Sequence, residues 1–248
     1  MERGRRVYHP TVAGEGAEIV LDLEETHHAI RVLRLRPGDP VSVFDGRGRE
    51  WEAVLVSSAR GGAAVRTGAE MKNLIDPTLP VTLFQGLCRP ERMEWVIQKG
   101  TEVGLHAIRP FAARRSEVDA PSAERLRRYR RVALEAAKQS GRRFVPDVSE
   151  PLSGLPLPPS GVLALLLDGG PEATPMVERL ARQRPESVWL AVGPEGGFEP
   201  AEVAALVTGG WWLTGLGPRT LRTETAGVAA AALVLHAWDD FGAARPMG

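Results

Sequence analysis

Four side chains capable of binding or proton-transfer chemistry stand close together near the end of the chain. They fall within seven residues and are Arg219, Arg222, Glu224 and Thr225. A guanidinium group offers a permanent positive charge and a fork of donors to an anion. A carboxylate within hydrogen-bond reach can accept a proton. This concentration of functional groups predicts a binding or catalytic site.

These residues belong to one of two strand–glycine loop–helix turns, 216–226 and Gly193–Phe198. The predicted strands before them are 187–192 and 211–216, and the predicted helices after them are 199–207 and 223–238. Ligands of open α/β sheets bind outside the carboxyl ends of the strands, and glycine lets a backbone approach a ligand closely. Ordinary tight turns remain the alternative, and neither loop matches a Walker A or a GxGxxG pattern.

Strands and helices alternate through the rest of the second part of the chain. The remaining predicted strands are 81–87, 107–112 and 162–167, and the remaining predicted helices are 91–103, 122–140 and 176–182. A third glycine loop, Asp168–Gly170, follows the strand at 162–167. This alternation is typical of a mostly parallel sheet covered by helices on both faces.

The first part of the chain is predicted to be rich in short strands. Apolar and polar residues alternate at 41–43 and 51–55 around the hairpin signal Asp45–Gly48, as expected for half-buried strands. One amphipathic helix is predicted at 26–35, with Ile30 and Leu33 facing inward. We therefore expect a small barrel or sandwich domain at 1–71 and an α/β domain at 72–248.

Composition is that of an ordinary globular protein. The chain has 248 residues, a formal net charge of zero and a single cysteine, Cys88, which excludes an internal disulfide framework and fits a reducing compartment. No apolar run has transmembrane length, and no apolar segment follows the basic start as in a signal peptide. We expect a cytoplasmic protein.

Positive charge is concentrated between Arg109 and Arg143, where eleven Arg and Lys residues face four acids. Such a surface attracts phosphate. Much of this charge lies on the outer face of the predicted helix at 122–140, where a plain solvated helix face is an equal alternative. The preference for arginine over lysine is best explained by base composition of the source genome.

Four segments in order resemble one known family. They are Arg92–Gly104, Glu135–Arg142, Gly193–Phe198 and Leu216–Ala226, and together they resemble the RsmE-type family of SPOUT methyltransferases over about 72–240. The first 70 residues resemble the family's PUA-like barrel more weakly. The resemblance implies methylation of N3 of one uridine in 16S (small-subunit) rRNA, on the assembled or assembling subunit, with S-adenosylmethionine as cofactor.

The resemblance also implies a fold and a cofactor site. The expected architecture is an α/β, SPOUT-type parallel sheet with a C-terminal trefoil knot, preceded by an RNA-binding PUA-like β-barrel, in a homodimer. The expected cofactor-binding residues lie on the three glycine loops and are Leu167, Asp168, Gly169, Gly193, Glu195, Gly196, Gly197, Leu213, Leu216, Gly217, Leu221 and Arg222.

Catalytic roles are assigned from the chemistry of methylating a neutral uracil N3–H. A cation beside the developing uracilate would stabilise it, as an oxyanion hole does, which favours Arg222 and Arg219. Glu224 could accept the proton, although helix N-terminal capping explains it equally well, and Glu195 could serve to brace its loop.

The expected RNA contacts are arginines of the first domain and of the family motifs: Arg3, Arg5, Arg6, Arg31, Arg34, Arg114 and Arg142. No spacing of His, Cys, Asp or Glu supports a metal site. An RNA-binding ribosome-assembly module without methyl transfer is the alternative function, and a nucleotide-dependent α/β enzyme of another kind is a third.

Overall fold

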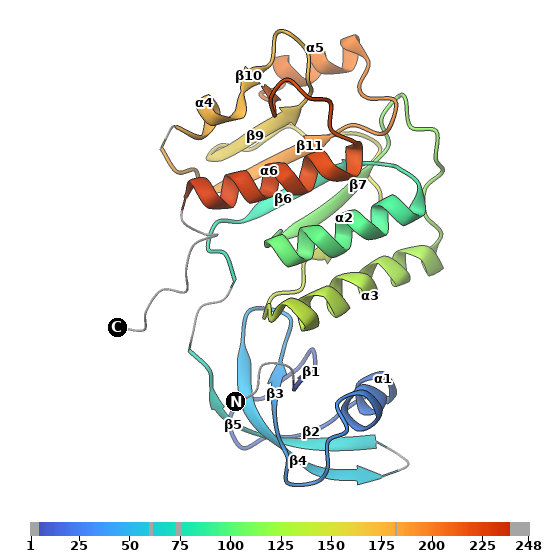
Figure 1. Cartoon of the computed structure of the whole chain (residues 1–248), viewed down its shortest axis with the longest axis vertical. Coiled ribbons are helices and arrows are strands. Elements are labelled where there is room, and N and C mark those ends of the chain that lie inside the picture. Colours follow the sequence, from blue (N-terminus) through green and yellow to red (C-terminus); the bar gives the residue numbers. More distant parts are fainter. Residues whose placement is uncertain (1–4, 60–61, 73–75, 182, 239–248) are drawn as a thin grey trace. The chain divides into compact units, whose positions relative to one another are not determined.

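A computed structural model describes residues 5–59, 62–72, 76–181 and 183–238 of the chain (Figure 1). Among these residues, contacts separate an N-terminal unit, 5–76 with 137–145, from a C-terminal unit, 77–136 with 146–238. No helix among the described residues is long and apolar enough to cross a membrane.

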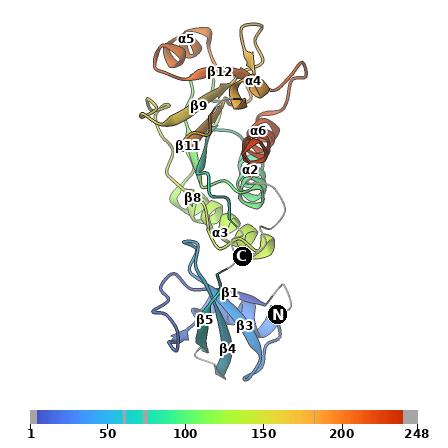
Figure 2. The same cartoon turned by 90° about the vertical axis from the view of Figure 1, so that its left-hand side faces the viewer.

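The N-terminal unit contains a curled five-stranded sheet in the order β1-β3-β4-β5-β2 (Figure 2). Its strands are β1 (Arg6–Tyr8), β2 (Glu18–Val20), β3 (Pro40–Phe44), β4 (Glu50–Ala59) and β5 (Gly62–Glu70). β1 pairs with β3 in parallel, and the other pairs are antiparallel. Val7, Val41, Val43, Leu55 and Val65 are fully buried in one core. The predicted β-rich first domain is confirmed.

The helical segment of this unit differs from the prediction. α1 (Leu23–His27) begins before residue 26, and the chain continues as a π-helix, η1 (His28–Val32). The side chain of Asp22 accepts a hydrogen bond from the backbone N–H of Glu25 at 2.8 Å, so Asp22 starts the helix. The Asp22–Glu25 pair is the capping signal that sequence periodicity missed. Ile30 and Leu33 do pack against the core, as expected.

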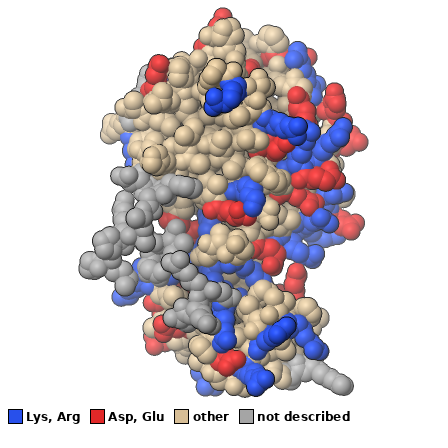
Figure 3. Space-filling view, viewed as in Figure 1, with Lys and Arg blue, Asp and Glu red and all other residues tan. Residues whose placement is uncertain are grey.

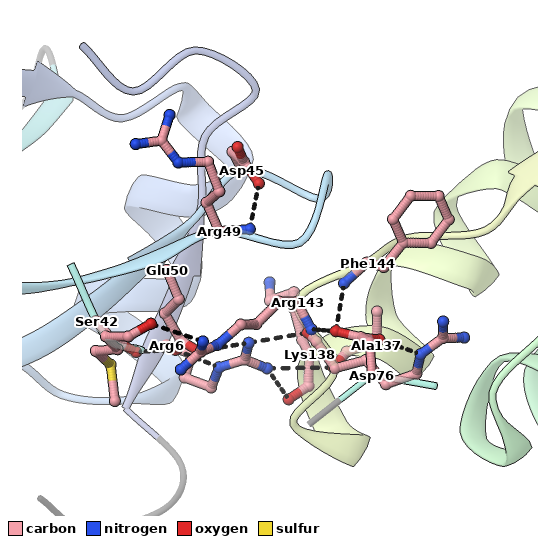
Figure 4. A network of polar contacts seen from close by, with 12 residues as sticks. Arg6, Ser42, Asp45, Arg49, Glu50, Asp76, Ala137, Lys138, Arg143 and Phe144 are labelled. Carbon is pink, nitrogen blue, oxygen red and sulfur yellow. Dashed lines mark hydrogen bonds and ion pairs between the residues drawn. The ribbon is translucent and has the colours of Figure 1, made fainter. Parts of the chain in front are cut away.

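A buried carboxylate lies at the centre of this unit (Figure 4). Glu50 is 3% exposed and accepts hydrogen bonds from Arg6 Nε at 2.8 Å, Arg143 Nε at 2.9 Å and Ser42 Oγ at 2.6 Å. The Arg6 guanidinium also lies 4.4 Å from the ring centroid of Phe44. Burial opposes ionisation of Glu50, but these donors outweigh it, and its pKa is lowered.

Further ion pairs attach the segment Ala137–Val145 to α1 and to the chain after β5. Lys138 Nζ lies 2.6 Å from Glu25 Oε1, and Arg142 Nε lies 2.7 Å from Asp76 Oδ1. The unit therefore extends past the expected boundary at 71 and includes a segment distant in sequence. Charge pairing over such a separation leaves no periodic signal in a sequence.

The C-terminal unit contains a seven-stranded, wholly parallel sheet in the order β10-β12-β9-β11-β6-β7-β8. Its strands are β6 (Val81–Gly86), β7 (Ala107–Phe111), β8 (Asp147–Val148), β9 (Val162–Leu167), β10 (Thr174–Pro175), β11 (Ser187–Val192) and β12 (Trp212–Gly215). Its helices are α2 (Pro90–Val103), α3 (Ala123–Ser140), α4 (Met176–Leu180), α5 (Pro200–Thr208) and α6 (Thr223–Ala237), and the last turn of α3 belongs to the N-terminal unit.

Helices cover this sheet on both faces. α2 and α6 lie side by side against one face (Figures 1 and 2). On the other, Val203 and Leu206 of α5 pack against an apolar cluster that includes Phe84 and Trp211. The predicted strands and helices of this unit are present with ends within about two residues of those expected. The two-residue strands β8 and β10 were not predicted, because they are too short to show a period.

We predict that Glu50→Gln lowers the free energy of unfolding by about 3 kcal/mol, because it leaves buried guanidinium groups without their counter-charge. Glu70→Gln is the matched control. Glu70 pairs with Arg49 at 2.7 Å on the surface, with 41% of its side chain exposed, and this variant should unfold like the wild type. Urea unfolding monitored by circular dichroism measures both.

The pH dependence of the free energy of unfolding tests the same substitution in a second way. Since the pKa of Glu50 is lowered in the folded state, its contribution is present above the pKa of the unfolded chain and is lost as the pH falls through the folded value. The stability difference between wild type and Glu50→Gln should therefore shrink below about pH 4.5. A difference that stays constant down to pH 3 would contradict the ionic role.

Candidate functional site

A cavity of about 570 Å³ lies at the carboxyl edge of the parallel sheet. It is lined by the loops that follow β9, β11 and β12, together with residues from the first turns of α2 and α6. Leu167 is paired in register with both Val192 and Thr214, so the three strands end at the same level. The sequence expectation that the glycine loops converge is met by this register, and the volume is that of a small-molecule site.

Thr223, the first residue of α6, connects the walls of this cavity. Gln85 Nε2, at the end of β6, donates to Thr223 Oγ1 at 2.8 Å, and Thr223 Oγ1 in turn donates to the carbonyl oxygen of Gly193. Gln85 and Thr223 are 0% and 8% exposed. Because a hydroxyl can accept and donate at once, this one side chain holds a helix, a strand and a glycine loop together.

Two glycines shape the same walls for different reasons. A Cβ on Gly86 would lie 2.4 Å from the backbone nitrogen of Pro194, so the loop after β11 can rest on the end of β6 only because no side chain intervenes. Gly217 has a φ of +108° and a Cβ there would meet no atom within 4 Å, so its constraint is conformational.

Charged groups gather beside the cavity around Arg92. Its Nη1 lies 3.1 Å from Glu195 Oε1, and its Nε lies 3.9 Å from Glu224 Oε2. Glu195 also accepts a hydrogen bond from the backbone N–H of Arg89 at 3.3 Å. Glu195 therefore braces its glycine loop against the start of α2, and Arg92 stands between two carboxylates.

The carboxylate of Glu224 is largely buried. Its side chain is 14% exposed, and its Oε2 is buried without a hydrogen-bond partner among the described residues. Arg222 Nη1 approaches Glu224 Oε1 at 4.0 Å while 78% of the Arg222 side chain remains exposed. No side-chain capping hydrogen bond forms at the start of α6, so helix capping accounts for Glu224 only through its place in the first turn.

The expected cofactor-binding residues line this cavity, with the exceptions of Gly196 and Leu213. The carbonyl of Gly196 accepts a hydrogen bond from Arg115 Nη1 at 3.3 Å. Leu213 packs against the apolar cluster of α5, because successive side chains of a strand point to opposite faces. Of the expected catalytic residues, Arg219 and Arg222 line the cavity and Glu224 lies beside it.

Arg92 and Thr223 were not assigned to the site from sequence. A usable signal existed for Arg92: it lies in the first turn of a helix that follows a parallel strand, and all such turns meet at one sheet edge. The position of Thr223 at a helix start indicated only helix capping. Its hydrogen bonds to Gln85 and Gly193 join residues far apart in sequence, so no local pattern reveals them.

The expected RNA-binding arginines are placed in different surroundings. Arg31, Arg34 and Arg114 are exposed, and Arg5 is partly exposed. The guanidinium groups of Arg6 and Arg142 are enclosed in the ion pairs with Glu50 and Asp76, with 11% and 6% of these side chains exposed, so they have little surface left for RNA. Arg3 lies outside the described residues. No group of three or more metal-ligating side chains occurs among the residues described.

The chain matches two known protein domains. Residues 76–235 match the RNA methyltransferase domain, and residues 21–67 match the RNA methyltransferase PUA domain. The chain belongs to this family of RNA methyltransferases. The α/β fold class and the PUA-type first domain expected from sequence are thereby confirmed.

Individual relatives agree with the family match. A protein of Mycobacterium tuberculosis named ribosomal RNA small subunit methyltransferase E is 35% identical over 247 residues, covering 94% of this chain and 92% of the relative. A protein of that name from Neisseria gonorrhoeae, crystallised with S-adenosyl methionine, is 31% identical with a TM-score of 0.86, covering 94% of this chain and 97% of that one.

A second solved structure has the same fold at lower identity. It is a putative methyltransferase from Legionella pneumophila in complex with the cofactor SAM, with 27% identity and a TM-score of 0.84, covering 95% of this chain and 98% of that one.

We predict that Gly86→Ala lowers the free energy of unfolding by about 1–3 kcal/mol, the usual range for overpacking, because the loop after β11 must move away from β6. The control is Gly154→Ala, whose Cβ would meet no atom within 4 Å and which should unfold like the wild type. Thermal and urea unfolding measure both variants, and equal stability of the two would contradict the close contact.

Proposed function

We propose that this protein transfers a methyl group from S-adenosylmethionine to N3 of a uridine in small-subunit rRNA, on the assembled or assembling subunit. The observation that carries the proposal is the cavity formed by three glycine loops at one sheet edge, in a chain of a methyltransferase family whose relative from Neisseria gonorrhoeae was crystallised with this cofactor.

The residues of the cavity fit such a cofactor. Glycines of all three loops line the cavity, where they let the backbone come close to a ligand, and Leu216, Leu221 and Phe198 supply apolar walls. These loops would hold the cofactor mainly through backbone groups, as the family resemblance implies. When bound, the cofactor supplies a methyl group activated by a positively charged sulfur.

The chain's own side chains would prepare the uracil. Arg219 and Arg222, both exposed and both lining the cavity, provide positive charge that favours the deprotonated form of N3. Glu224 would accept the proton, since its buried Oε2 has no hydrogen-bond partner among the described residues. Arg92 would keep this carboxylate and that of Glu195 oriented.

RNA would be recruited by the exposed arginines. We assign this role to Arg5, Arg31 and Arg34 in the PUA-type unit and to Arg114 in the methyltransferase unit, with Arg3 as a further candidate. Arg114 combines exposure with contacts to Glu202 and Glu199, so it sits on a fixed backbone. Because ribosomal RNA is the proposed substrate, we place the protein in the cytoplasm.

We further propose the trefoil knot and the homodimer implied by the resemblance to SPOUT enzymes. Exposed apolar side chains on two adjoining helices support the dimer: Trp95 on α2 is 40% exposed and Leu233 on α6 is 47% exposed. Large apolar groups on neighbouring helices mark an interaction surface.

We expect S-adenosylhomocysteine to bind with measurable heat and the protein to transfer labelled methyl groups to small-subunit particles that lack the modification. Calorimetry measures the first, and mass mapping of the nucleosides identifies N3-methyluridine. Binding without transfer to any RNA would contradict catalysis, whereas no heat at millimolar ligand would favour an RNA-binding assembly module.

We predict that Arg222→Ala reduces kcat by at least about 100-fold, the cost of removing one group that stabilises developing negative charge. Its melting temperature should stay close to that of the wild type, since the side chain is 78% exposed. Arg222→Lys should recover part of the rate, because it restores the charge without the fork of donors. Methylation by the alanine variant at the wild-type rate would remove Arg222 from the mechanism.

We predict that Leu233→Asp converts a dimer into a monomer without unfolding it, because a carboxylate cannot be buried unpaired in an apolar interface. Leu157→Asp serves as control, since Leu157 is 73% exposed and lies outside α2 and α6. Light scattering gives the mass of each, and a wild-type monomer would refute the dimer proposal.

A further inference from the structure

A second, smaller cavity of about 210 Å³ lies beside the first. Its walls come from the segment after β6, the start of α2, the loop 118–122 and the start of α3. The two cavities share one wall: Arg92 lines the larger and the next residue, Met93, lines the smaller. A ligand in the smaller cavity would therefore lie close to the proposed site of methyl transfer.

One polar group that lines this cavity is available to a ligand. Tyr129 is 3% exposed and lines the cavity, yet its hydroxyl makes no hydrogen bond with any described residue. The hydroxyl oxygen is accessible from the cavity side rather than sealed in the core, so it can donate or accept a hydrogen bond with a ligand that enters. Leu87 and Met93 provide buried apolar wall.

The phenol and the thiol of the cavity are uncharged, and its charged lining residues, Asp119 and Arg125, are of opposite sign. Burial raises the pKa of Tyr129 to about 12 and that of Cys88 to about 12, so the phenol and the thiol both remain protonated at neutral pH. Arg125 is partly exposed, and its Nη1 lies 3.7 Å from Glu94 Oε1. The chemistry suits a neutral, flat ligand that offers a hydrogen bond at one edge.

Size restricts the ligand further. An apolar cavity of about 150 Å³ accepts one benzene ring, so 210 Å³ suits a single substituted six-membered ring and not the two rings of a purine. Pyrimidine bases of RNA have this size, are neutral, carry donors and acceptors on one edge, and are joined to phosphate. RNA-binding proteins take up such unstacked bases between apolar side chains.

The surface around the cavity carries side chains of both charges. Lys and Arg side chains are interleaved with Asp and Glu on the side of the molecule where α2 and α3 lie (Figure 3). On it, Arg128 and Arg125 both pair with Glu94. Because these arginines are paired with Glu94, the helix face offers little free positive charge to the RNA backbone. Binding of a base in the cavity would add a contact that the helix face alone does not provide.

We propose that the cavity between α2 and α3 binds one unstacked pyrimidine base of the substrate RNA, a neighbour of the nucleotide that is methylated, with Tyr129 as its hydrogen-bonding partner. This inference rests on the proposed function for the identity of the RNA. A base bound in this cavity would set which nucleotide of the RNA strand reaches the larger cavity.

The test uses the full chain with methyl-labelled methionine, saturated with S-adenosylhomocysteine so that the larger cavity is filled. Uridine should shift the Met93 methyl resonance in a saturable manner, and adenosine should not. Met176 is the internal control, because it is buried on α4 and lines neither cavity. An unmoved Met93 resonance, or an equal response to adenosine, would overturn the proposal.

Two variants make the titration specific. Tyr129→Phe removes only the hydroxyl and should weaken uridine binding about tenfold, whereas Tyr8→Phe, the same change in the N-terminal unit, should have no effect. Ala120→Trp fills the cavity from an exposed position and should abolish the shift. A shift that persists in Ala120→Trp would show that uridine binds elsewhere.

Kinetics connects the cavity to the reaction. On small-subunit particles, Tyr129→Phe should lower kcat/KM about tenfold, mainly through KM, with unchanged affinity for S-adenosylhomocysteine. A kcat/KM equal to that of the wild type would contradict a role in substrate binding. If the wild type methylates no RNA, the proposed function fails, while the Met93 titration still decides whether the cavity binds a pyrimidine.

Discussion

The site depends on the hydrogen bonds of one hydroxyl group, that of Thr223. It accepts from Gln85 on β6 and donates to the carbonyl of Gly193, so the start of α6 is tied to β6 and to the glycine loop after β11 that lines the cavity. Gly86 makes this arrangement possible, since any side chain there would displace the loop after β11. The close contact of the β6 and β11 backbones therefore shapes the cavity, and the charged side chains line its edge.

Much of the methyltransferase unit could be predicted from local patterns. Continuous apolar runs such as 162–167 mark buried parallel strands, and the residues after them must meet at one edge of the sheet. That rule places Asp168, Gly193 and Gly217 around one cavity without any knowledge of the fold's details. Gly196 and Leu213 were expected in the cofactor site from the family resemblance, but they do not line the cavity. Leu213 faces the other side of β12 from Thr214, which does line it.

The remaining features depend on contacts between residues far apart in sequence. Arg6 and Arg142 are surface cations by composition, yet they are enclosed with Glu50 and Asp76. The pairing of Arg143 with Glu50 spans 93 positions and leaves no periodicity to detect. Arg92 likewise acquires its two carboxylate partners only when α2 is placed beside the loop after β11 and the start of α6.

The division of α3 between the two units has an evolutionary consequence. Its last turn and the residues that follow supply Lys138 and Arg143 to the PUA-type unit, so that unit is completed by a stretch encoded in the middle of the methyltransferase sequence. A fragment of residues 1–71 would lack these cations, so Glu25 would lose Lys138 and Glu50 would keep only Arg6 as its charged partner. A gene segment that ends at residue 71 would therefore encode an incompletely paired unit.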